Sequence, residues 1–226
     1  MTLMVLLSGC FYPQEKKVQN QVPTEQQIQM VQSAVDQYQK DNDGLLPIKT
    51  KEKDTDLYIK YPIEFKKLIP EYLSEPPGNA FENGGIFQYV LIDVEKNPTV
   101  KMFDLRIAEE IRGIQLRLHS KDGYPPFKEQ IAPNVYTLDF EKIGYKKDPQ
   151  IVSPYTNNNL PLIISGDGNI YVDYSSDLYE AMKKHDHSFQ KGEDIRPILT
   201  KDSHFVPAYS LPYTTTENNE PAFMAK

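Results

Sequence analysis

The sequence has one cysteine, Cys10, and no tryptophan among its 226 residues. A single cysteine cannot form a disulfide within the chain, so packing rather than covalent cross-links must hold the fold. Without tryptophan, the 15 tyrosines and 10 phenylalanines must supply the large rings of the core. Long apolar runs are also missing from the sequence, because none reaches the roughly 18 residues that a membrane-spanning helix needs.

Positive charge is in the minority, with 25 Lys and Arg against 32 Asp and Glu and a formal net charge of -7. Nucleic-acid binding needs clustered cations to neutralise phosphates, so we expect no nucleic-acid partner. Glycine is scarce as well, with 11 residues against 18 prolines, which indicates stiff loops. The mean hydropathy of -0.57 is polar but sufficient for small cores. The length of 226 residues allows one large domain or two small ones.

A short apolar stretch at the start of the sequence ends at the cysteine. Leu7-Ser8-Gly9-Cys10 resembles a bacterial lipobox, in which an aliphatic residue and two small residues precede a cysteine that receives diacylglycerol. The resemblance implies lipid attachment at Cys10, a signal peptide over residues 1–9 and a polar tether over residues 10–23. It also implies a lipoprotein on the outer face of the plasma membrane of a Gram-positive bacterium.

The leader departs from the usual pattern in two ways. It lacks an early Lys or Arg, and the apolar residues Leu3 to Leu7 are fewer than the roughly 7–15 of a full signal core. We therefore expect translation to start upstream of Met1. The alternative interpretation is a buried N-terminal strand with an incidental thiol. A diacyl anchor is the form we expect, because one acyl chain binds membranes only marginally.

Residues 24–103 predict a first unit of helix and sheet. Apolar residues with helical spacing run from Ile28 to Tyr38, and a short helix is expected over Ile63–Leu68. Two β-rich segments, Ile86–Asp93 and Thr99–Phe103, then predict a pair of antiparallel strands.

Residues 104–187 repeat this order of signals. Asp104 can cap a second helix, in which apolar residues again recur with helical spacing. Leu160–Ser165 and Asn169–Tyr174 then predict two strands joined by Gly166-Asp167-Gly168, a strong hairpin signal. A calcium loop is the weaker interpretation of that turn, because the ligand spacing of an EF-hand is missing.

The offsets between equivalent signals favour an internal duplication. Gly123 follows Gly44 by 79 residues, Phe140 follows Phe65 by 75, and Pro154 follows Pro77 by 77. We therefore predict an α+β protein with two tandem small domains, each a helix packed on an antiparallel sheet. The alternative is two unrelated α+β stretches that share common turn residues.

Each half resembles the globular head of type II secretion pseudopilins and type IV pilins. The resemblance depends on the helix end at Tyr38–Pro47, the segment Leu68–Leu73 and the aromatic strand Phe87-Gln88-Tyr89. It implies a small α+β head with a helix on an antiparallel sheet. Pilins carry a long apolar N-terminal helix, and this chain has a lipobox instead, so fibre assembly is not implied.

The whole chain is similar to the YphF-like lipoproteins of Bacillus and relatives. The similar stretches are the lipobox, YPIEFKKLIPEYLSEPPGNAF, EKNPTVKMFDLR and VSPYTNNNLPL. Members of that family have been described as transporter-associated binding proteins. The resemblance implies no catalytic residues.

His185-Asp186-His187 is the nearest approach to a metal cluster, because two histidines and a carboxylate can bind zinc. Neighbouring residues on a helix point in different directions, and His119 or His204 would have to come close to complete a site. We therefore interpret the two histidines as the solvated end of a helix over Asp177–Lys184, and we expect neither a metal nor another cofactor.

The sequence also lacks motifs that are typical of enzymes. The sequence has no G-x-S-x-G elbow and no glycine-rich phosphate loop. The acids Asp104, Glu109 and Glu110 fit the start of a helix, where negative charge is stabilising. We therefore expect no enzyme, and a hydrolase is the least favoured hypothesis.

Two hypotheses of function follow. The first is a membrane-anchored lipoprotein that binds a protein or glycan partner at the cell envelope. The second is a solute-binding lipoprotein associated with an ABC transporter, with its ligand between the two domains. The sequence assigns no ligand-binding residues, and it leaves open whether residues 188–226 form an extended strap or a disordered tail.

Overall fold

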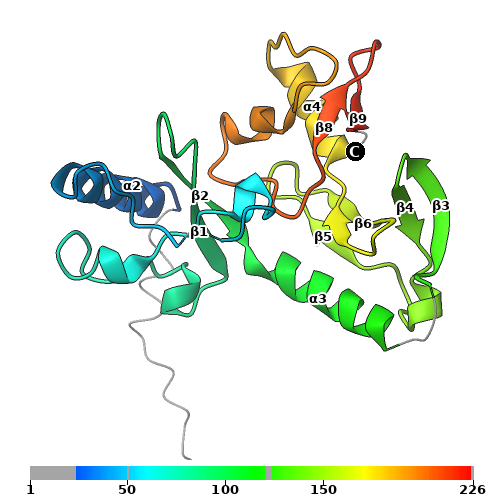
Figure 1. The fold of residues 1–226 in the computed structure, drawn as a ribbon, viewed down its shortest axis with the longest axis horizontal. Coiled ribbons are helices and arrows are strands. Elements are labelled where there is room, and N and C mark those ends of the chain that lie inside the picture. The colour runs from blue at the N-terminus through cyan, green and yellow to red at the C-terminus, as the bar shows by residue number, and fades with distance from the viewer. Residues whose placement is uncertain (1–23, 50, 121–123, 225–226) are drawn as a thin grey trace, which may run out of the picture.

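The structure is a computed structural model that describes residues 24–49, 51–120 and 124–224 (Figure 1). The signal peptide, lipobox and tether expected over residues 1–23 lie outside the described residues, as does Gly123, which the sequence aligned with Gly44. The helices and strands are α2 (Thr24–Asp41), β1 (Phe87–Ile92), β2 (Thr99–Asp104), α3 (Leu105–His119), β3 (Phe127–Ala132), β4 (Val135–Leu138), β5 (Gln150–Val152), β6 (Asn159–Ser165), β7 (Ile170–Val172), α4 (Ser175–Lys184), β8 (Tyr213–Thr215) and β9 (Pro221–Phe223). The helices and antiparallel strands confirm the α+β class.

The first half of the fold places α2 against the β1–β2 hairpin. An irregular segment lies beside β1, because the Ile63 N–H donates to the Tyr89 carbonyl at 3.0 Å and the Leu91 N–H donates to the Tyr61 carbonyl at 2.9 Å. A further segment pairs with that one through Lys49 N–H and the Pro62 carbonyl at 3.0 Å. The order across this layer is therefore the segment with Ile48, Lys49 and Lys51, then residues 60–63, β1 and β2, and α2 buries its apolar side against it.

The second half contains the five-stranded sheet. Four of its strands lie in the order β3, β4, β6, β7, all antiparallel, and β5 pairs with the start of β6. Helix α3 buries Ile107, Ile111 and Ile114 in the core that covers this sheet. Each half therefore has a helix followed by four segments that pair in the same order, and the second half adds β5 and α4.

Local signals place the ends of several elements as expected. Gly44 ends α2 with φ at +85° and donates its N–H to the Gln39 carbonyl at 2.9 Å. The Asp104 carboxylate accepts from the Arg106 N–H and so caps α3, as the sequence predicts. The hairpin across Gly166-Asp167-Gly168 is also confirmed. The helix expected over Ile63–Leu68 is shorter, a 3-10 turn over Phe65–Lys67.

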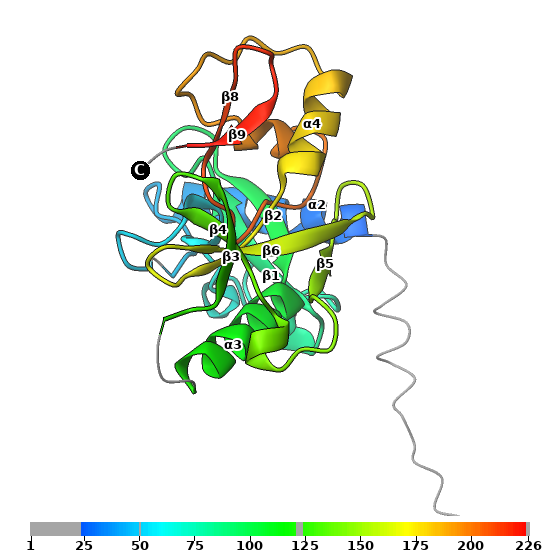
Figure 2. The ribbon, with the colours of Figure 1, turned by 90° about the vertical axis from the view of Figure 1, so that its right-hand side faces the viewer.

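The tail runs between the two sheets. The Met102 N–H on β2 donates to the His204 carbonyl at 2.9 Å, and the Val206 N–H returns a bond to the Met102 carbonyl at 3.1 Å. A few residues later, the Val172 N–H on β7 donates to the Tyr209 carbonyl at 2.8 Å. The orange and red segments in Figure 2 then rise to the β8–β9 hairpin beside α4. Of the two alternatives from the sequence, the described tail follows the extended one.

A buried arginine joins the tail to the first half. The side chain of Arg196 is 5% exposed, and its Nη1 and Nη2 atoms each lie 2.8 Å from a carboxylate oxygen, of Asp56 and Asp194 respectively. Its guanidinium also lies 5.0 Å from the ring centre of Tyr58 and donates to the Ser210 carbonyl. Burial works against its charge, but the bonds to the two carboxylates dominate and raise the pKa of Arg196.

Candidate functional site

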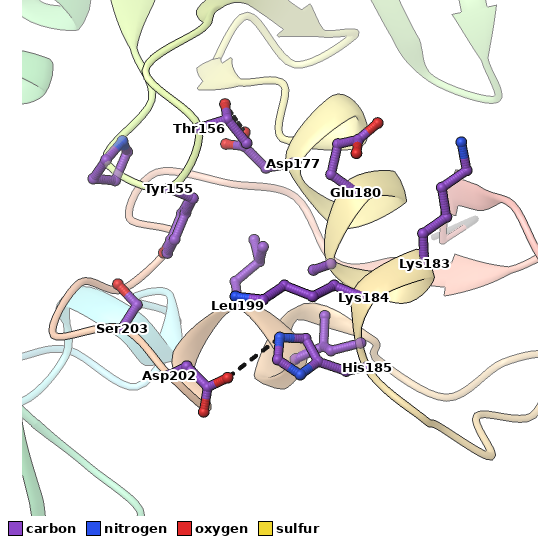
Figure 3. A pocket seen from close by; sticks show the side chains of 13 residues that line it. Tyr155, Thr156, Asp177, Glu180, Lys183, Lys184, His185, Leu199, Asp202 and Ser203 are labelled. Carbon is purple, nitrogen blue, oxygen red and sulfur yellow. Dashed lines mark hydrogen bonds and ion pairs between the residues drawn. The ribbon is translucent and has the colours of Figure 1, made fainter.

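A hollow of about 510 Å³ opens between α4, the turn before β6 and the tail. We call it the α4 hollow. Figure 3 shows Tyr155 and Thr156 on one wall, α4 on the opposite wall, and Asp202 and Ser203 of the tail below them. Its lining residues are Pro154, Tyr155, Thr156, Asp177, Glu180, Ala181, Lys183, Lys184, His185, Ile198, Leu199, Asp202 and Ser203.

A buried carboxylate fixes the turn that forms one wall of the α4 hollow. Asp177, in the first turn of α4, is 1% exposed and accepts hydrogen bonds from Ser153 Oγ at 2.8 Å and Thr156 Oγ1 at 2.7 Å. The Ser153 hydroxyl oxygen in turn accepts from the N–H groups of Tyr155 and Thr156. Asp177 is thus committed to holding the turn, which makes it a structural group rather than a free acid.

The same carboxylate predicts a dependence of stability on pH. Burial raises the pKa of Asp177, and the two hydroxyl bonds oppose that shift only in part. The folded state therefore holds the proton at a higher pH than the unfolded chain does. As pH falls through the raised pKa towards the ordinary value, this group favours folding more.

We expect the stability difference between the natural chain and Asp177→Asn to change in favour of the natural chain as pH falls from 7 to 4. Urea unfolding at several pH values measures it, and the sign is informative even though other carboxylates titrate, because they are common to both proteins. A difference that is constant with pH, or one that moves the other way, would contradict the buried state of this carboxylate.

Two side chains of opposite charge on α4 line the α4 hollow and make no hydrogen bond to another described residue. Glu180 and Lys184 are exposed, and neither side chain forms a hydrogen bond or ion pair with another described residue. They lie four residues apart and so share one side of the helix. In Figure 3 the Lys184 side chain extends across the hollow towards Tyr155. Both groups are therefore available to a bound molecule.

An aromatic ring and an ion pair complete the α4 hollow. The half-buried ring of Tyr155 packs edge-on to Tyr174, with ring centres 6.2 Å apart. The Tyr155 hydroxyl is buried and has no hydrogen-bond partner within the described ranges, and burial raises the pKa of Tyr155. At the lower end, His185 Nε2 lies 3.5 Å from Asp202 Oδ2.

The two histidines that the sequence offered as weak metal candidates have separate environments. His185 faces Asp202 in the α4 hollow, whereas His187 stacks on Phe189, with ring centres 5.4 Å apart. His187 Nε2 also lies 3.3 Å from Asn219 Nδ2. Within the described part of the chain, no group of three His, Cys, Asp or Glu residues is placed to hold a metal ion.

Part of the chain is similar to a known protein family. Residues 24–104 match the model of the YphF family N-terminal domain. That range begins at the first residue of α2 and ends at the residue that caps α3. No curated protein and no solved structure matches the chain, so the likeness to pseudopilin heads stays a prediction.

Residues of the range 24–104 form most of a second hollow, of about 740 Å³. Leu57, Tyr61 and Ile92 form its apolar side, and Pro197 of the tail also lines it. Lys101 lies at its base, where Nζ donates to the carbonyls of Thr200 at 2.8 Å and Ser203 at 2.6 Å, and burial lowers the pKa of Lys101. No residue of 105–187 lines this hollow, and no residue of 24–104 lines the α4 hollow.

Sequence reasoning missed the α4 hollow because three distant segments build it. One local signal was present, the i and i+4 pair Glu180 and Lys184 on the predicted helix. The contributions of Tyr155 and of Ser203 depend on where the tail crosses, which no local pattern states. Among the described residues, no helix is long and apolar enough to cross a membrane.

Proposed function

We propose that this protein is a membrane-anchored, extracytoplasmic lipoprotein without enzymatic activity, and that it binds a protein or glycan partner at the cell envelope. The support for the anchor is the Leu7-Ser8-Gly9-Cys10 pattern, which places the chain's one cysteine where a lipobox requires it. From Cys10 to Thr24 the chain can span up to about 45 Å when extended, which gives the folded part reach above a membrane.

The observation that carries the binding role is the α4 hollow. It is open, and the exposed charges of Glu180 and Lys184 face it with no bond to another described side chain. Asp177, the acid best shielded from water in this hollow, is instead occupied by two hydroxyl groups. Such a site suits recognition of a polar surface group better than it suits acid–base chemistry.

The anchor makes a direct prediction for Cys10→Ser. The natural protein should carry diacylglycerol on Cys10 and partition into detergent, whereas the variant should lose the lipid and drop roughly tenfold or more in detergent partition. Detergent phase separation and mass spectrometry of the mature N-terminus measure both effects in a Gram-positive host. Ser8→Ala is the control, because it keeps a small residue at the cleavage site.

The outcome that would overturn the anchor is a natural protein recovered from the cytosol with an unmodified thiol at Cys10. Equal detergent partition of the natural chain and Cys10→Ser would count against it as well. Either result would remove the support for placing the folded part at the cell envelope.

A solute-binding lipoprotein associated with an ABC transporter is the second proposal. The observation that favours it is the apolar side of the second hollow, formed by Leu57, Tyr61 and Ile92. Against it, neither of these two hollows is lined by residues of both halves. The ion pair between Arg196 and Asp56 also fixes the tail to the first half. A solute that raises the melting temperature of the whole chain, with an effect that depends on Leu57 and Ile92 of the second hollow and not on Glu180 and Lys184, would favour this proposal over the first.

A further inference from the structure

The charges that line the α4 hollow nearly balance. Its acids are Asp177, Glu180 and Asp202, its positively charged side chains are Lys183 and Lys184, and His185 faces Asp202. A pocket with one dominant sign would concentrate ions of the opposite sign, but this arrangement selects neither anions nor cations strongly. The physical consequence is a preference for ligands that are polar and uncharged.

The hollow contains both hydrogen-bond donors and hydrogen-bond acceptors. Glu180 can only accept, Lys184 can only donate, and the Ser203 hydroxyl can do both. A molecule with closely spaced hydroxyl groups satisfies such a set, because each hydroxyl both donates and accepts. A ligand with acceptors alone would leave Glu180 unpaired, and one with donors alone would leave Lys184 unpaired.

The walls also offer apolar contact. The Tyr155 ring stands opposite α4, and Ile198 and Leu199 also line the hollow. The face of an aromatic ring is electron-rich and attracts the weakly positive C–H groups on one side of a pyranose ring. The volume of about 510 Å³ lies within the range of roughly 300–1,000 Å³ that is usual for small-ligand sites.

We propose that the α4 hollow is a subsite for a neutral saccharide, with Tyr155 as the stacking platform and with Glu180 and Lys184 as hydrogen-bonding partners of the sugar hydroxyls. This proposal rests on the proposed function, since it chooses the glycan among the two envelope partners named there. The ligand is a short stretch of uncharged pyranose units within a glycan.

The test titrates the full folded chain with three neutral trisaccharides, maltotriose, cellotriose and triacetylchitotriose, and follows amide shifts by NMR. We expect at least one of them to bind, with shifts centred on α4 and on residues 153–157. Glu180→Gln and Lys184→Met should each weaken binding about fivefold, because each removes one charge-assisted hydrogen bond. Both positions are exposed, so the variants should keep the natural melting temperature.

Matched controls make the same chemical changes elsewhere. Glu109→Gln on α3 and Lys66→Met in the first half are exposed and lie outside both hollows, so they should leave saccharide affinity unchanged. Because the ligand is neutral, affinity should also be nearly the same at 50 and 500 mM salt, whereas a charged ligand would bind more weakly at high salt.

Two results would overturn the inference: no binding of any of the three sugars at 10 mM, or binding that Glu180→Gln and Lys184→Met leave unchanged. A photo-crosslinker placed at Lys183, with one at Glu109 as control, separates this failure from failure of the proposed function. Specific capture of an envelope protein at Lys183 without sugar binding would overturn the saccharide and retain the binding role. Capture of nothing from the envelope, together with no sugar binding, would reject both.

Discussion

A chain that ends at His187 is expected to be largely unfolded at 25 °C and to show no cooperative unfolding transition. The truncation removes a set of buried apolar residues: Ile195, Ile198, Leu199, Val206, Ala208, Leu211 and Tyr213. A large apolar side chain contributes about 1.5–3 kcal/mol when fully buried, so the lost burial is comparable with the 5–15 kcal/mol that keeps a typical domain folded.

The loss is not confined to the removed residues. Tyr58, Val90 and Phe103 of the first half pack against Val206 and Ala208 and would face water without them. The truncated chain no longer has to order its tail, which returns some conformational entropy to the balance. We expect the net loss still to be about 5 kcal/mol or more, because both halves lose cover at the same time.

Circular dichroism during urea unfolding and binding of a hydrophobic dye measure this prediction. The control is a chain that ends at Thr216, which loses β9 and with it the contact between Phe223 and Tyr213, whose ring centres lie 4.6 Å apart. It should unfold cooperatively, with a free energy of unfolding about 1–3 kcal/mol lower than that of the natural chain. Cooperative unfolding of the chain that ends at His187, with a comparable urea dependence, would show that the two halves fold without their strap.

Arg196→Met is the second large prediction, and it should lower the free energy of unfolding by about 3 kcal/mol. Methionine fills much of the same space but leaves Asp56 and Asp194 without their partner in a partly buried setting. The Ser210 carbonyl also loses the N–H that it accepts. Arg196→Lys should recover only part of the loss, because one ammonium cannot reproduce the fork of bonds to two carboxylates.

The matched control is Arg106→Met, which removes a guanidinium that pairs with Asp104 in the same chain. The Arg106 side chain is 68% exposed, so its removal should lower the free energy of unfolding by less than about 1 kcal/mol. A double-mutant cycle with Asp56→Asn isolates the contact that joins the tail to the first half. Equal losses for Arg196→Met and Arg106→Met, or no coupling to Asp56, would contradict the bracing role.

The parts of the fold that the sequence predicted are those with local causes. Helical spacing and Gly44 define α2, Asp104 begins α3, and the Gly-Asp-Gly turn closes the β6–β7 hairpin. Strands β3, β4 and β5 were missed for a physical reason. Exposed residues fill the middle of β3 and its register to β4 shifts twice, so no alternation of apolar and polar residues marks it. Strands β4 and β5 have only four and three residues, too few to show a period.

The candidate site was harder to predict than the fold. The sequence drew attention to His185 and His187, which are close along the chain and which the structure places in different environments. The α4 hollow combines the turn at Tyr155, the side of α4 and the tail at Ser203. Those segments meet because Arg196 and the bonds to Met102 and Val172 fix the course of the tail, and such long-range contacts leave no periodic trace.

The crossing of the tail also bears on how the protein behaves when many copies crowd together on a surface. An unpaired outer strand presents free N–H and carbonyl groups on which a neighbouring molecule can template its own strand. Here His204, Val206 and Tyr209 occupy such groups on β2 and β7. At the opposite margin, β3 carries the charges of Lys128 and Glu129 and an irregular register, which discourage strand addition. These contacts and charges leave β2, β7 and β3 less able to add a strand from a neighbouring copy.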